Sequence, residues 1–272
     1  MKLIEELRSA AIHEELPVDR FDGMSIKSRC QLISGLIGSL KNKEPHKIYG
    51  SGSHVRRTLE NLISTLNPSE AFIDFQNERF QRFMDELQSA KNSPLLNGLR
   101  HWDGVDKSEN EKQLIVECAR LHQDIYTRSE VVNIHTPYIF TETLSNELSK
   151  CFRVQAGKTS SNLITGEVEI FHNIKDPFAL ANKAGALEIA HHETTHAIQF
   201  CFAMAYQSEQ LQPSHPLYDD AKLFHTIESS GAYIPGYILK RTELDAYTQQ
   251  PHERLAFAEG YKLSDAIIEL SQ

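Results

Sequence analysis

The sequence of 272 residues predicts an α+β fold that is mostly helical, with a small mixed sheet packed on the helix that carries His192 and His196. Apolar side chains recur at helical spacing through most of the chain, which favours amphipathic helices. Between residues 131 and 171, β-branched or alternating patterns indicate strands instead. Turn-forming residues fill 92–107. We therefore expect a helical N-terminal region over residues 1–107, with no indicated role, and a second domain over residues 108–272.

The helical pattern divides into separate elements. In the first half the expected helices are Met24–Leu40, Val55–Leu66, a helix that Asn67 caps and Pro68 opens and that runs to Leu87, and Glu109–Thr127. Gly50–Ser53 should be a flexible joint. In the second half, Asp176 can cap a long helix that reaches Tyr206, because no proline interrupts the sequence from Phe178 to Tyr206.

Three short segments are expected to form the sheet. They are Val131–Ile134, Phe152–Gln155 and Glu167–Phe171. The last of these directly precedes the long helix, so the sheet should pack against it.

Charge and hydropathy exclude several classes of protein. Asp and Glu outnumber Lys and Arg by 37 to 28, a net charge of -9, and no basic stripe is present, so we expect no nucleic-acid partner. No apolar run reaches the ~18 residues of a membrane span, so we expect no membrane association. The first sixteen residues carry charges throughout, unlike a secretory signal, so we expect a cytoplasmic protein. Cys30, Cys118, Cys151 and Cys201 should then be free thiols.

The most informative motif is His192-Glu193-Thr194-Thr195-His196. Two histidines four residues apart lie on one face of an α-helix, ~5–6 Å from each other, which suits two ligands of one metal ion. Zinc binds neutral imidazole nitrogen and favours four ligands, so one further protein ligand and a water are expected. His191 lacks such a spacing and should be a packed or exposed histidine.

Glu193 has a different task from its neighbours. It is turned about 100° around the helix from His192, so it cannot easily bind the same ion. It can reach a water bound to that ion, accept its proton during attack and deliver the proton to the leaving group. Glu193 is therefore the expected general base.

With its uncharged interior and apolar flanks, the segment Ile189–Ile198 resembles the extended HExxH pattern of the zincin metallopeptidases. The resemblance implies a zinc-dependent peptidase. Glu167–Phe171 also resembles the edge strand on which zincins hold extended substrate. Phe202 stands where metzincins have their third histidine, so a downstream carboxylate is the expected third ligand.

Four carboxylates are candidates for that ligand, namely Glu228, Glu243, Asp245 and Glu253. Glu253 ranks first because Pro251 can open a helix with Glu253 in its first turn, and Ala256 leaves room one turn later. The segment Tyr247–Ala256 resembles the Tyr…Pro-x-Glu-x-x-Ala pattern of gluzincin-like families, in which the Glu is the third zinc ligand. Glu243 ranks second, and Asp245 can instead orient a ligand imidazole.

An oxyanion stabiliser is expected among the tyrosines near this segment. Tyr247 is the first candidate, and Tyr233, Tyr237 and Tyr261 compete with it.

The sequence thus predicts a zinc hydrolase, most readily a peptidase that acts on peptide or protein substrates. Two alternatives stay open: a protein that binds zinc without catalysis, and an interaction protein that works through its helical N-terminal half. A host-directed bacterial effector protease also fits an acidic chain without a signal sequence. Nothing in the sequence indicates the oligomeric state.

Overall fold

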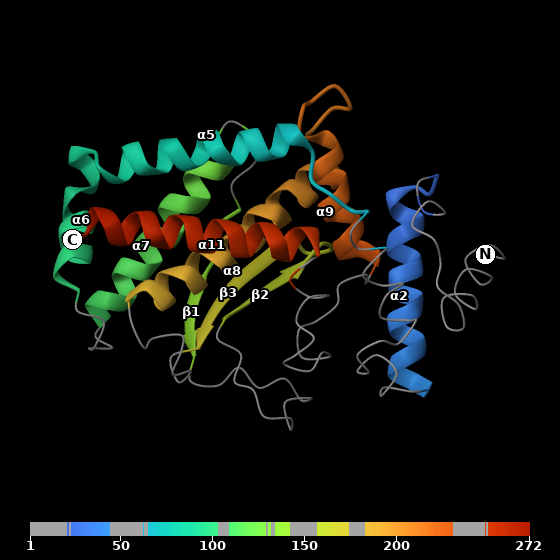
Figure 1. Cartoon of the computed structure of the whole chain (residues 1–272), viewed down its shortest axis with the longest axis horizontal. Coiled ribbons are helices and arrows are strands. Elements are labelled where there is room, and N and C mark those ends of the chain that lie inside the picture. The colour runs from blue at the N-terminus through green and yellow to red at the C-terminus, as the bar shows by residue number, and fades with distance from the viewer. Residues whose placement is uncertain are drawn as a thin grey trace.

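The computed structural model describes residues 21, 23–43, 62, 65–102, 109–128, 130–131, 134–141, 157–173, 183–230, 248 and 250–272. These residues form seven α-helices, a short 3-10 helix and one three-stranded sheet (Figure 1). The helices are α2 (Ile26–Lys43), α5 (Glu70–Leu87), α6 (Ser93–His101), α7 (Glu109–Thr127), α8 (Lys183–Gln207), α9 (Tyr218–Ser230) and α11 (Pro251–Leu270). The 3-10 helix η2 (Ala90–Asn92) joins α5 to α6.

The sheet consists of β1 (Tyr138–Thr141), β2 (Gly157–Asn162) and β3 (Glu167–Asn173). Its order is β1-β3-β2, with β1 parallel and β2 antiparallel to the central β3. Val168 and Ile170 of β3 pack against Ala197 and Phe200 of α8. The predicted fold class, mostly helical with a small mixed sheet on the motif helix, is confirmed.

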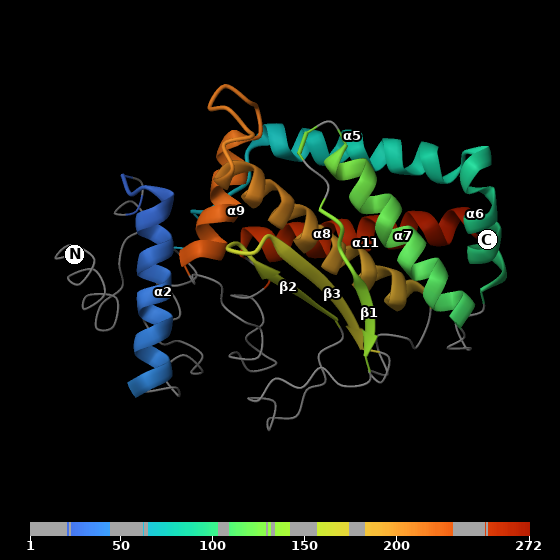
Figure 2. The same cartoon turned by 180° about the vertical axis from the view of Figure 1, so that it is seen from behind.

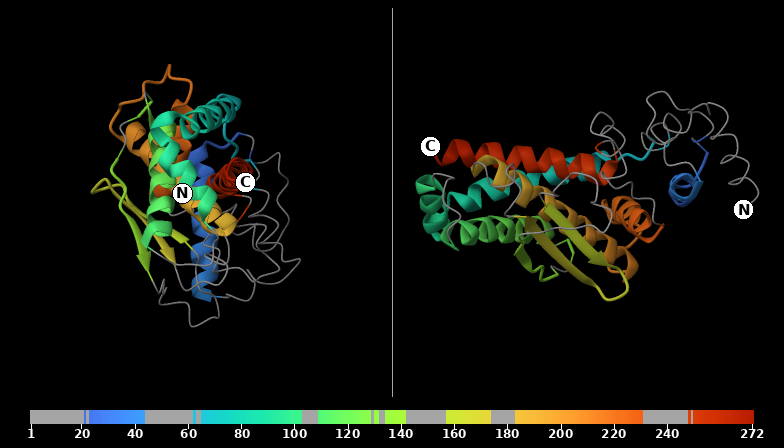
Figure 3. Two further views of the ribbon diagram at one scale, coloured as in Figure 1. Left: turned by 90° about the vertical axis from the view of Figure 1, so that its left-hand side faces the viewer. Right: turned by 90° about the horizontal axis from the view of Figure 1, so that it is seen from below.

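Helix α8 lies in the middle of the molecule. The sheet covers one side of it and α11 the other, so that α8 is the central layer of three (Figures 2 and 3). Sixteen of its side chains are buried, including His192 and Glu193. A helix that is apolar on most sides needs this two-sided cover. The motif residues are therefore held on a rigid, buried element.

Two expectations for the strands are wrong. Val131 and Ile134 lie outside the sheet, and the backbone oxygen of Ile134 accepts a hydrogen bond from Gln123 Nε2 at 2.7 Å instead. The parallel strand begins later, at Tyr138. Glu167–Phe171 is a strand, but β3 is the central strand of the described sheet, and β1 and β2 are at its edges. The pattern missed β2 because its sequence, GKTSSN, contains no apolar residue.

The start of α5 also differs from the expectation. The capping residue is Ser69 rather than Asn67, and its hydroxyl accepts a hydrogen bond from the Phe72 backbone NH at 3.1 Å. Asp220 of α9 accepts hydrogen bonds from both the hydroxyl and the backbone NH of Ser69. This contact between segments far apart in sequence explains why the cap lies two residues later. The predicted bounds of α7 are confirmed, and α2 overlaps its prediction closely.

The principal hydrophobic core joins residues from α5 to α11. Phe202 of α8 has edge-on contacts with Phe72 and Phe75 of α5, with ring centroids 5.8 and 5.6 Å apart. Helix α5 therefore packs on the motif helix, although it lies before residue 107. The division of the chain at that residue stays a prediction.

Several expectations fall outside the described residues. They are the joint Gly50–Ser53, most of Val55–Leu66, the strand Phe152–Gln155, the Asp176 cap and Cys151. Cys118 and Cys201 are buried free thiols, as expected, and Cys30 is also buried. In the part of the chain that the structure describes, no helix has the length and hydrophobicity needed to cross a membrane.

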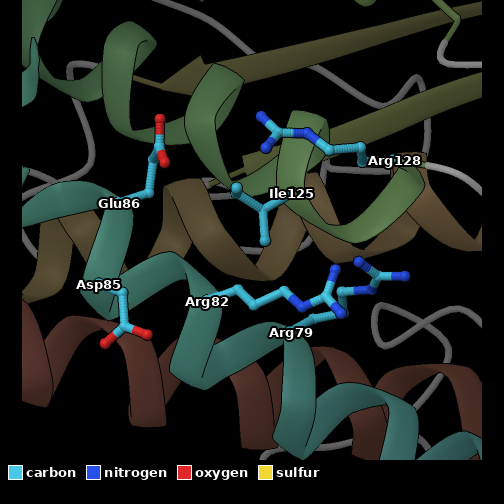
Figure 4. Close-up of a pocket in the computed structure, with 6 residues that line it drawn as sticks. All are labelled: Arg79, Arg82, Asp85, Glu86, Ile125 and Arg128. Atoms are coloured by element: carbon cyan, nitrogen blue, oxygen red, sulfur yellow. The ribbon is translucent and has the colours of Figure 1, made fainter.

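A cavity of about 230 Å³ lies between α5 and the end of α7 (Figure 4). Its lining residues are Arg79, Arg82, Asp85, Glu86, Ile125 and Arg128. None of these residues belongs to the HExxH motif, so this cavity is separate from the candidate metal centre.

Candidate metal centre

Helix α8 places the two motif histidines side by side. Their Nε2 atoms are 3.2 Å apart and their ring centroids are 4.8 Å apart. His192 is buried and the side chain of His196 is 16% exposed. Two imidazole nitrogens thus point to a common place from one face of the helix, as the spacing predicts.

Helix α11 brings a carboxylate to the same place. It begins at Pro251, which puts Glu253 in the first turn. Glu253 is 1% exposed, and its Oε2 atom lies 3.5 Å from Nε2 of both His192 and His196. Among the described residues, His192, His196 and Glu253 form the one group of this kind that can hold a metal ion. Their candidate ligand atoms lie within 4.8 Å of one another.

The charges at this group favour a bound cation. Burial raises the pKa of Glu253, but His196, His192 and His252 oppose it, and the net result is a pKa well below the ordinary value. Burial lowers the pKa of His196, yet Glu253 above all raises it to about 9. A buried carboxylate that stays charged favours positive charge nearby, and here it favours the protonated form of the neighbouring imidazole. A divalent ion bound to the same three atoms supplies that charge, so the residues present fit a metal.

His252, the residue before Glu253, is also buried and sits beside the group. Its ring centroid is 6.0 Å from that of His196, and its Nε2 is 4.0 Å from Glu253 Oε1. Burial lowers its pKa to about 4, so the imidazole is neutral near pH 7. It is not part of the convergent group.

Gln199 links the two helices at the site. Its Oε1 accepts a hydrogen bond from Nδ1 of His196 at 2.9 Å, and its Nε2 donates to the His252 backbone oxygen at 2.9 Å. With the proton on Nδ1, the Nε2 lone pair of His196 is available to a metal. Gln199 thus sets the tautomer and orientation of one candidate ligand.

Gly260 allows α11 to approach α8. A Cβ atom at this position would lie 3.0 Å from the Glu188 backbone oxygen and 3.3 Å from His192 Cβ. Ala256, expected to leave the room for this approach, is fully buried. Gly260 is the residue at which the two helices meet beside His192.

Glu193 points toward the sheet. Its carboxylate Oε2 lies 2.8 Å from Thr159 Oγ1 of β2, and its own backbone oxygen is 2.8 Å from the same hydroxyl. Tyr138 of β1 is on this side too. Burial raises the pKa of the Tyr138 phenol well above its usual value, and the charges of Glu193 and Cys118 raise it further.

His191 is a packed histidine, as the sequence indicates. It is fully buried, and its Nδ1 lies 3.2 Å from Nδ1 of His122 on α7. Burial lowers the pKa of His191 to about 3 and that of His122 well below its usual value. Both rings are therefore neutral and tie α7 to α8 behind the candidate metal centre.

The remaining candidates from the sequence separate into two sets. Glu228 lies at the end of α9, where its Oε2 accepts a hydrogen bond from Ser161 at 3.3 Å, and it is not in the convergent group. Tyr261 is half-exposed and hydrogen-bonds Glu188. Glu243, Asp245, Tyr233, Tyr237 and Tyr247 lie outside the described residues.

Sequence reasoning missed three residues at the site. Gln199 lies three positions after His196, so helical spacing could have indicated it. Gly260 lies seven positions after Glu253, and a glycine inside a helix without a capping role indicates close packing. Thr159 had no signal, because its strand was not predicted.

Comparison of the chain with family models, with curated proteins and with solved structures finds no match. The site geometry and the motif are thus the basis for any assignment of function.

Proposed function

We propose that this protein is a zinc-dependent hydrolase, and that it cleaves peptide bonds. One observation carries the proposal: two imidazole nitrogens from α8 and a carboxylate oxygen from α11 converge beside a buried Glu193. Two nitrogens and one oxygen are the donor set of catalytic zinc sites of the His-His-Glu type. The peptide substrate class follows from the resemblance of Ile189–Ile198 to zincin peptidases.

Each residue has a separate role in this proposal. His192, His196 and Glu253 would hold the ion, which when bound would lower the pKa of water to about 7 and polarise a carbonyl group. Glu193 accepts the proton of the attacking water and passes it to the nitrogen of the leaving amine. Gln199 keeps the Nδ1 proton of His196 in place.

A protein that binds zinc without catalysis is the competing assignment. Structural zinc sites are closed by four protein ligands, whereas catalytic sites have three and an open position. The group found among the described residues has three members. The buried glutamate directly beside the first histidine is a further feature that a purely structural site does not require.

The substitution Glu193→Gln tests the proposal. Zinc content should stay that of the unchanged protein, because Glu193 is not a ligand, while hydrolysis of a labelled peptide library should fall by ~10²–10⁴-fold, the usual contribution of a general base. Glu209→Gln is the matched control, since Glu209 is exposed just after α8. Full hydrolytic activity in zinc-loaded E193Q would rule out the mechanism.

A further inference from the structure

We propose that Thr159 and Gly157 of the edge strand β2 position the carboxylate of Glu193 for proton transfer. Thr159 anchors one carboxylate oxygen, and Gly157 leaves the space for the other. The inference rests on the proposed function of Glu193 as general base, and it assigns to β2 a part in the reaction itself.

The first observation is the position of the Thr159 hydroxyl. Oγ1 lies 2.8 Å from Glu193 Oε2 and 2.8 Å from the backbone oxygen of the same residue. Both oxygens are acceptors, so the hydroxyl is the donor, and it shares its single proton between them. Because the Thr159 hydroxyl contacts both the backbone oxygen and the carboxylate of Glu193, it restrains the side-chain torsions of Glu193. Because threonine is branched at Cβ, its own rotamer is stiff, and the anchor does not move freely.

The second observation concerns the other carboxylate oxygen. Gly157 and Thr159 are two residues apart on β2, so they face the same side of the sheet. A Cβ atom at Gly157 would lie 2.8 Å from Cγ and Oε1 of Glu193, and 2.8 Å from Cγ2 of Ile189 on the same helix. Among the described glycines, only Gly166 has a positive φ, so Gly157 is required for space rather than for backbone conformation. The glycine therefore leaves room for the carboxylate where it is.

Substitutions at Gly157 and at Thr159 have different structural consequences. A Cβ at Gly157 would meet both Glu193 and the methyl Cγ2 of Ile189, so Gly157→Ala must displace the Glu193 carboxylate and shift Ile189 as well. Thr159→Val keeps the shape of the side chain and removes the hydrogen bond. Neither change touches His192, His196 or Glu253, so the metal group should survive both.

The kinetic test uses zinc-loaded protein and a quenched fluorescent peptide, chosen from a random library with the unchanged enzyme. We expect kcat of T159V and of G157A to fall by about tenfold or more, because a misplaced catalytic group loses rate steeply. KM and zinc content should stay unchanged. Thr159→Ser should restore most of kcat, since serine supplies the same hydroxyl. The matched control is Thr165→Val in the β2–β3 turn, where the hydroxyl donates to exposed Glu167.

A second readout does not need activity. In metal-free protein, the change in urea midpoint caused by T159V should be smaller in the Glu193→Ala background than in the unchanged chain, because the carboxylate partner is already absent. This coupling tests the contact even if the protein proves not to be a hydrolase.

The outcomes separate the two proposals. Full kcat in both T159V and G157A overturns the positioning role. Loss of both zinc and activity in T159V would show that Thr159 stabilises the strand and does not position Glu193. That result also overturns the positioning role. If the zinc-loaded protein without any substitution has no hydrolase activity, the proposed function is refuted. If T159V shifts the urea midpoint equally in the unchanged chain and in the Glu193→Ala background, the Thr159–Glu193 contact is refuted.

Discussion

At the scale of single residues, the candidate site depends on which nitrogen of each imidazole is free. Gln199 accepts a hydrogen bond from Nδ1 of His196 on α8 and donates one to the His252 backbone oxygen on α11. One side-chain amide thus forms hydrogen bonds with both helices. Residues of this kind fix the ring orientation and raise the affinity of a metal ligand. The electrostatic partner of His196 is Glu253, which holds the pKa of His196 at about 9 against the opposing effect of burial.

Replacing Gln199 should weaken zinc binding without abolishing it. In Gln199→Met the volume is nearly kept, but His196 Nδ1 and the His252 carbonyl lose their partner. We expect zinc affinity to fall by ~10–100-fold, measured by competition with a chromogenic chelator. Gln207→Met is the control on the same helix, because Gln207 is exposed and its Nε2 donates to the Leu163 backbone oxygen in the β2–β3 turn. Equal affinities of Q199M and the unchanged protein would refute the role of Gln199.

At the scale of elements, the site is made by the close contact of α8 and α11. One helix supplies both histidines and the other supplies Glu253, so the position of the carboxylate depends on the distance between the helices. Gly260 sets this distance, because its bare Cα faces the backbone of Glu188 and the Cβ of His192.

The substitution Gly260→Ala should separate the helices locally. Alanine gains up to ~1 kcal/mol of helix propensity, but its Cβ would lie 3.0 Å from a backbone oxygen that cannot swing away. We expect zinc affinity to fall by about tenfold or more while the chain stays helical, measured by calorimetric titration and circular dichroism. Gly23→Ala is the control, since a Cβ there meets nothing within 4 Å. Unaltered affinity in G260A would show that Gly260 does not set the site.

The elements also show what the sequence could and could not predict. Helix α7, which has regular apolar spacing, was predicted to the residue, because burial of one face dictates that spacing. Strand β2 was not, because its polar residues are in a strand through pairing with β3 and contact with α8. The start of α5 depends on Asp220, 151 residues away from Ser69 in the sequence.

At the candidate site too, local sequence patterns predict some residues, and contacts between distant segments determine the others. The spacing of His192 and His196 indicates a metal by itself, since a helix brings residues four apart together. Pro251 indicates a helix start that presents Glu253. The partners Thr159 and Gly260 come from other elements, and their contacts exist only once the sheet and α11 are packed on α8. Local patterns hold no information on such contacts.

At the scale of the whole molecule, buried polar contacts join α7 and α11 across the core. The Tyr126 hydroxyl donates to Glu259 Oε2 at 2.6 Å, and both side chains are buried. Burial raises the pKa of Glu259, and the hydrogen bond from Tyr126 and the charge of Lys262 lower it in part, which leaves the pKa above its ordinary value.

This raised pKa makes the stability of the fold depend on pH. Between the unfolded and the folded pKa of Glu259 the folded state binds more protons, so the free energy of unfolding decreases as pH rises through that window. Glu259→Gln keeps an acceptor for Tyr126 and removes the charge. We expect E259Q to be at least as stable as the unchanged protein near pH 7 and to lose this part of the pH dependence.

Urea unfolding at a series of pH values measures the effect, with Glu269→Gln as the exposed control on the same helix. The difference in unfolding free energy between E259Q and the unchanged protein should grow in favour of E259Q as pH rises from about 4.5. A difference that stays constant with pH would show that Glu259 has the same pKa in both states.

The most direct measurement is a zinc titration of metal-free protein, compared with Glu253→Ala. We expect about one zinc ion per unchanged chain, because His192, His196 and Glu253 form a single site. We also expect an affinity at least ~100-fold weaker in E253A, because loss of one of the three protein ligands leaves the two imidazoles. Failure of the unchanged protein to bind zinc, or equal affinity in E253A, would contradict the assignment of this group as the metal centre.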